Sequence, residues 1–85
     1  MQFALSHRHA AGECGVAYAA WCGFESPLRH APTLASCGSE PVPGPAEHLL
    51  LWTVEAPSEE VALAMLPRWL AERTEVRRVA EVPIP

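Results

Sequence analysis

Two histidines, His7 and His9, flank Arg8 near the start of the chain. Alternate side chains of a β-strand project from the same face, so this spacing directs two imidazoles toward one point. A carboxylate, Glu13, and a thiol, Cys14, follow a few residues later. Imidazole nitrogen and thiolate sulfur suit zinc, nickel and copper ions, and imidazole is also an acid–base group near neutral pH. This segment therefore indicates metal-ligand or acid–base chemistry in a small space.

The first half of the chain predicts the elements that must position these groups. Residues 2–9 alternate between apolar and polar side chains and predict a strand. An apolar stripe at helical spacing over residues 14–22 predicts an amphipathic helix that ends at Gly23. Residues 33–38 predict a short strand. Pro41, Pro43, Gly44 and Pro45 interrupt regular structure, so residues 39–46 are predicted to form a loop.

The second half repeats this plan. Residues 48–55 form a nearly continuous apolar run, which is typical of a central strand covered on both faces. A second helix is predicted to begin at Ser58, which can cap its N-terminus, and to kink at Pro67. Residues 75–84 predict a closing strand. The order β-α-β-β-α-β is that of the ferredoxin-like fold.

We therefore predict one α+β domain over residues 1–85: a ferredoxin-like βαββαβ arrangement with a four-stranded antiparallel sheet and two helices on one face. In this fold the strand order is 4-1-3-2. The ends of the first and second strands then share an edge of the sheet with the starts of the third and fourth. Residues far apart in the sequence are expected to meet at that edge.

This topology predicts a transition-metal site for nickel, zinc or copper. Its candidate ligands lie at the ends of the predicted elements and are His7, His9, His48, Cys14 and Cys37. Glu13 is an alternative to a cysteine as the fourth ligand. No ligand pair has a recognised metal-binding spacing such as CxxC or HExxH.

Other interpretations of the same residues remain open. Cys14 and Cys22 lie on the apolar helix stripe, where a free cysteine packs like a small hydrophobic residue. A small-molecule or catalytic site would use a pocket between sheet and helices, lined by Tyr18, Trp52 and His7. A purely structural dimerisation module would need neither metal nor pocket. The chain has no glycine-rich phosphate loop and no Ser-His-acid order, so enzymatic activity is left open.

Composition narrows the class of protein. The chain has 85 residues, a net charge of −4 and scattered arginines, so it lacks the basic stripe of a nucleic-acid-binding protein. No apolar run approaches the roughly 18 residues of a membrane span, and the N-terminus does not resemble a signal peptide. An odd count of 3 cysteines fits a reducing cytoplasm. A chain this short buries a smaller fraction of its surface on folding than a large domain does, and self-association would enlarge its apolar core. We therefore expect a homodimer.

Two stretches carry a family resemblance. The sequence WTVEAPSEEV at residues 52–61 and the closing EVPI at residues 81–84 resemble small ferredoxin-like domains of the dimeric α/β-barrel superfamily. Some of those domains carry histidines at the end of the first strand and are associated with nickel or other metals. The resemblance implies a dimer, and it implies metal ligands at His7 and His9.

Overall fold

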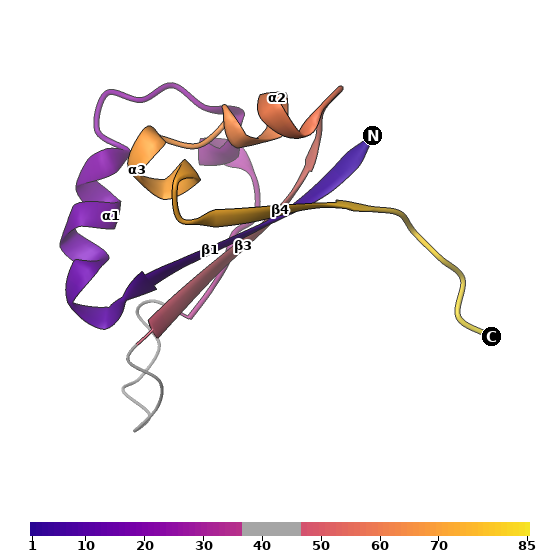
Figure 1. Ribbon diagram of the computed structural model, residues 1–85, viewed down its shortest axis with the longest axis horizontal. Coiled ribbons are helices and arrows are strands. Elements are labelled where there is room, and N and C mark those ends of the chain that lie inside the picture. Colours follow the sequence, from indigo (N-terminus) through magenta and orange to yellow (C-terminus); the bar gives the residue numbers. More distant parts are fainter. Residues whose placement is uncertain (37–46) are drawn as a thin grey trace.

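The sheet is built around two long strands. The computed structural model describes residues 1–36 and 47–85. The elements are β1 (Gln2–Ala10), η1 (Ala11–Glu13), α1 (Cys14–Ala20), η2 (Pro27–His30), β2 (Leu34–Ala35), β3 (Glu47–Glu55), α2 (Glu59–Leu63), α3 (Arg68–Ala71) and β4 (Thr74–Val79). The strands pair antiparallel in the order β2-β3-β1-β4, and the three α-helices lie on one face of the sheet (Figure 1). The predicted α+β class with a four-stranded antiparallel sheet is confirmed.

Alternation along β1 determines which side chains enter the core. Phe3, Leu5, His7 and His9 are all buried under the helices, whereas Arg8 is exposed on the opposite face. The pairing register with β3 places Leu5 opposite the buried Trp52 and His9 opposite His48. Two histidines therefore continue a row that begins with apolar core residues.

The predicted second helix consists of two short helices. The Ser58 hydroxyl caps α2 by accepting a hydrogen bond from the Val61 main-chain N–H at 3.2 Å. Pro67, which has no N–H to donate, stands between α2 and α3. Leu66 and Leu70, on either side of it, are buried against the sheet.

The predicted closing strand is shorter in the structure. The prediction of a strand through residue 84 is wrong beyond Val79, because Val79 already pairs with Gln2 at the start of β1 and no further partner follows. In the described part of the predicted strand over residues 33–38, which ends at residue 36, Leu34 and Ala35 pair with β3. The predicted loop over residues 39–46 lies outside the described residues, as does Cys37.

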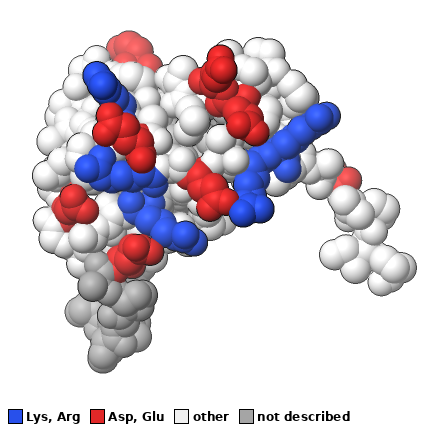
Figure 2. Space-filling model, viewed as in Figure 1, with Lys and Arg blue, Asp and Glu red and all other residues white. Residues whose placement is uncertain are grey.

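Charge is mixed on the face drawn in Figure 2, where arginine and glutamate side chains lie next to one another. Exposed ion pairs in the structure include Arg68–Glu72 and Arg77–Glu75. Among the helices of residues 1–36 and 47–85, none has the length and apolar character to cross a bilayer.

Candidate metal centre

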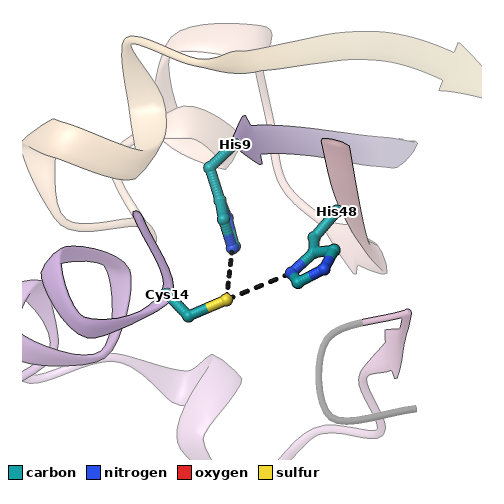
Figure 3. Close-up of side chains that lie close together, drawn as sticks. All are labelled: His9, Cys14 and His48. Atoms are coloured by element: carbon teal, nitrogen blue, oxygen red, sulfur yellow. Dashed lines mark hydrogen bonds between the residues drawn. The ribbon is translucent and has the colours of Figure 1, made fainter. Parts of the chain in front are cut away.

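Three side chains from three elements converge at one edge of the sheet. His9 near the end of β1, Cys14 at the start of α1 and His48 near the start of β3 each offer one donor atom, and these atoms lie within 4.8 Å of one another. Figure 3 shows both imidazoles pointing toward the Cys14 sulfur. This is the convergence that the topology predicted for these residues.

Local structure fixes each of the three positions. His9 and His48 are cross-strand partners on the helix-covered face, so their rings lie side by side, with centroids 5.6 Å apart. The single turn of η1 then reverses the chain after β1 and brings Cys14 over the pair. The Glu13 carboxylate stabilises this turn by accepting a hydrogen bond from the Ala10 N–H at 3.0 Å.

The distances suit one metal ion. Cys14 Sγ lies 3.5 Å from His9 Nε2 and 3.1 Å from His48 Nδ1. A zinc ion with Zn–S of about 2.3 Å and Zn–N of about 2.1 Å holds its sulfur and nitrogen ligands about 3.6 Å apart at a tetrahedral angle. Both sulfur–nitrogen distances are within a few tenths of an ångström of this value. The two imidazole nitrogens, which lie within 4.8 Å of each other, would move toward the separation of about 3.4 Å that a tetrahedral zinc ion sets.

A second histidine supports the first. His7 is fully buried, and its Nδ1 lies 3.2 Å from the main-chain oxygen of Leu70 while its Nε2 lies 2.9 Å from His9 Nδ1. Because a carbonyl oxygen only accepts, Nδ1 of His7 carries the proton, and Nε2 of neutral His7 accepts from the Nδ1–H of His9. The Nε2 of His9 is then left with a lone pair directed at Cys14. This carbonyl–histidine–histidine chain is the kind of support that orients metal-binding imidazoles.

Burial keeps both imidazoles in the neutral form. It lowers the pKa of His7 below the usual 6.5, with the hydrogen bond to Leu70 opposing it and nearby His9 and Arg73 adding to it. Burial and the neighbouring His48 likewise lower the pKa of His9. The neutral imidazole is the form that binds metal ions.

Trp69 covers the histidine pair from α3. Its ring centroid lies 5.9 Å from that of His7 and 6.3 Å from that of His9. The guanidinium of Arg73 lies over the outer face of the indole, with Cζ 3.9 Å from the ring centroid. Trp69 and Arg73 together separate His7 and His9 from solvent on this side.

An open cavity borders the site. It has a volume of about 540 Å³, and its lining includes His9 and Cys14 together with the apolar side chains of Ala17, Trp21 and Leu50. A second open cavity of about 440 Å³ shares Tyr18, Trp21 and Leu50 and extends along the sheet to Trp52. Of the residues predicted to line a pocket between sheet and helices, Tyr18 and Trp52 line this open cavity, whereas His7 lines neither cavity.

The structure thus separates the predicted ligands into groups. His9, Cys14 and His48 come together; His7 lies behind His9, with both ring nitrogens in hydrogen bonds; Cys37 falls outside the described residues. Glu13 accepts a hydrogen bond within the turn before α1. Cys14, predicted as a core residue in one interpretation, is half-buried with its sulfur on the two imidazoles, and Cys22 is exposed instead of buried.

Sequence analysis missed the groups that support His7. The Thr74 hydroxyl donates to the Leu70 oxygen at 2.6 Å and lies 3.5 Å from His7 Nδ1. Thr74 pairs with His7 across β1 and β4, so a correct register for β4 would have found it. The position of Trp69 in the sequence gives no indication that its ring lies against the histidine pair.

Comparisons with known proteins add no relative: no protein-family model, no curated protein and no solved structure matches the chain. The function therefore has to be argued from the site itself.

Proposed function

We propose that the protein binds one transition-metal ion through His9 Nε2, Cys14 Sγ and His48 Nδ1. The observation that carries the proposal is the convergence of these three donor atoms, contributed by three different elements, within 4.8 Å. The hydrogen bonds of His7 support it, because they fix the tautomer of His9, whose Nε2 faces Cys14. The set of two imidazoles and one thiolate favours zinc, nickel or copper over magnesium or calcium, which prefer oxygen ligands.

Metal titration of single-site variants tests the proposal. Zinc, nickel and copper are titrated separately into wild type, His48→Ala and His30→Ala, and bound metal in the purified protein is measured by elemental analysis. His30 is the matched control because it is an exposed histidine on η2, outside the cluster. We expect one ion per chain for wild type and His30→Ala, with Kd tighter than about 1 μM, and at least about tenfold weaker binding for His48→Ala. Wild-type binding weaker than micromolar for all three metals would overturn the proposal.

A thiol–imidazole catalytic pair is the second candidate. The favouring observation is the 3.1 Å separation of Cys14 Sγ and His48 Nδ1 beside an open cavity, because an adjacent base activates a cysteine nucleophile. This candidate predicts that metal-free Cys14 reacts with iodoacetamide about tenfold faster than Cys22, and that His48→Ala abolishes the difference. Equal rates for the two cysteines in metal-free wild type would exclude it.

The sheet supports a ferredoxin-like assignment. Read from its other edge, the order β2-β3-β1-β4 is 4-1-3-2, which is the order expected for that fold. All strand pairs are antiparallel, and helices cover a single face. We take this arrangement as support for the resemblance to the dimeric α/β-barrel superfamily.

We also propose that the chain forms a homodimer through the sheet face that no helix of the described residues covers, here called the uncovered face. Leu49 and Leu51 lie on this face, half-buried, and Leu34 is 70% exposed beside them. Val82 and Ile84, in the segment after β4, are also exposed. A reducing compartment such as the cytoplasm fits the proposed role of Cys14, since the thiol must stay reduced to bind metal.

A further inference from the structure

We propose that the metal ion keeps one coordination position for a small molecule with a soft donor group, such as a thiolate, and an apolar body that lies in the adjoining cavity. This inference rests on the proposed metal centre and adds the class of ligand that the centre takes. It concerns the cavity of about 540 Å³ that borders His9 and Cys14.

The described ligands leave room for such a molecule. In the described parts of the chain, the cluster has three members, whereas zinc and copper(I) bound to sulfur and nitrogen commonly take a fourth ligand. Two other candidates among the described residues have other roles: His7 bonds to Leu70 and His9, and Glu13 bonds to the Ala10 N–H. Three protein ligands and one exchangeable position are the arrangement of catalytic zinc sites, whereas structural sites are closed by four protein ligands.

The cavity lies where that exchangeable ligand would extend. Its lining contains His9 and Cys14, so a molecule bound to the ion on this side enters the cavity directly. The volume is within the range of roughly 300–1,000 Å³ that small-molecule sites occupy. Ala17, Trp21 and Leu50 make the remaining wall largely apolar, which selects for a hydrocarbon or aromatic body over a polar one.

One exposed aromatic residue marks the mouth of the cavity. Tyr18 lines both open cavities although its side chain is 80% exposed. A ring so exposed contributes little to the core, but an aromatic guest in the cavity would contact it and bury part of its surface. Val16, on the same helix and 51% exposed, lines neither cavity and is the matched control position.

Cobalt-substituted protein tests the inference with two thiols. Benzyl mercaptan carries an aromatic body, and 2-mercaptoethanol is a thiol of similar acidity without one. Each is titrated into Co²⁺-loaded wild type, Tyr18→Ala and Val16→Ala. Binding is followed by the thiolate-to-cobalt charge-transfer absorption, which increases when a second sulfur joins that of Cys14.

We expect benzyl mercaptan to bind wild type at least about tenfold tighter than 2-mercaptoethanol, because only its ring buries apolar surface. Tyr18→Ala should reduce that preference several-fold, and Val16→Ala should leave it unchanged. If cobalt binds but neither thiol alters the spectrum, or both bind equally, the inference is overturned while the metal centre stands. If cobalt itself does not bind, the inference fails, and the zinc, nickel and copper titrations decide whether the metal centre stands.

Discussion

The imidazole of His7 holds the imidazole of His9 in a single tautomer. Their facing nitrogens lie 2.9 Å apart, and the other nitrogen of His7 is anchored 3.2 Å from the Leu70 main-chain oxygen. One carbonyl group on α3 thereby determines which nitrogen of His9 carries the proton, and leaves the lone pair on the nitrogen that faces Cys14. The two histidines, though separated by one residue in sequence, have different roles in the proposed centre: His9 is the proposed ligand, and His7 is its support.

The tautomers are directly observable. Long-range ¹H–¹⁵N NMR spectra of the metal-free protein at neutral pH should show the Nδ1–H form for both His7 and His9, because the chain of hydrogen bonds begins at a carbonyl oxygen. His30, which is exposed, should show the mixture of tautomers typical of imidazole in water. A proton on Nε2 of His9 would contradict the proposed role of His7.

Replacing His7 should lower the metal affinity of the site without removing a proposed ligand. His7→Leu retains side-chain volume but leaves the Nδ1–H of His9 without its acceptor. We expect zinc affinity to fall by about 10–100-fold and the free energy of unfolding to fall by about 1–3 kcal/mol. Zinc affinity is measured by competition with a chromophoric chelator. The free energy of unfolding is measured by urea denaturation of the metal-free protein. His30→Leu should change neither, and a folded His7→Leu protein with wild-type zinc affinity would refute the support role.

Stability of the metal-free protein should depend on pH in a defined direction. The pKa values of His7 and His9 are lower in the folded state than the ordinary 6.5, chiefly through burial. Below pH 6.5 the unfolded chain therefore binds more protons, so stability is greatest above this pH and decreases as the pH falls toward the folded-state pKa values. His48, Arg73 and Glu13 supply the charges that modulate this effect.

The slope of the free energy of unfolding against pH has a physical limit. Each histidine can contribute at most about 1.36 kcal/mol per pH unit. Urea denaturation with a chelator present, from roughly pH 5 to 8, measures the slope. His7→Leu should flatten the curve and His30→Leu should not. A stability that rises on acidification below pH 6.5 would show that the buried imidazoles are charged in the folded state.

The uncovered sheet face gives a prediction about assembly. Leu51 lies near its centre, half-buried and opposite Ser6 of β1. Leu51→Glu places a charge in the proposed dimer interface, so we expect wild type to sediment as a dimer and the variant as a monomer. Val16→Glu, a change at an exposed position of α1 on the other side of the molecule, should remain dimeric. Monomeric wild type at high micromolar concentration would exclude this interface.

Sequence patterns predicted the central strands and the convergence of His9, Cys14 and His48 because both follow from local rules. Alternation assigns β1, a continuous apolar run assigns β3, and antiparallel pairing places the end of one beside the start of the other. The early end of β4 was not predictable from its own residues, since it depends on where β1 begins.

The roles of His7 and Cys22 were also beyond sequence patterns. His7 shares its strand face with His9, and only the position of the Leu70 oxygen, set by the break at Pro67 and the packing of α3, makes it a support. Cys22 follows the apolar helix spacing, but α1 ends at Ala20, so the stripe no longer continues along a helix and Cys22 is exposed.

X-ray absorption of the zinc-loaded wild-type protein tests the central claim most directly, because it counts the ligand atoms around the ion. The site at His9, Cys14 and His48 predicts one sulfur at about 2.3 Å and two imidazole nitrogens at about 2.0–2.1 Å, with the sulfur lost in Cys14→Ser and retained in Cys22→Ser. A wild-type spectrum without a sulfur ligand would show that the ion binds elsewhere. So would a spectrum with two sulfur ligands that is unchanged in Cys14→Ser.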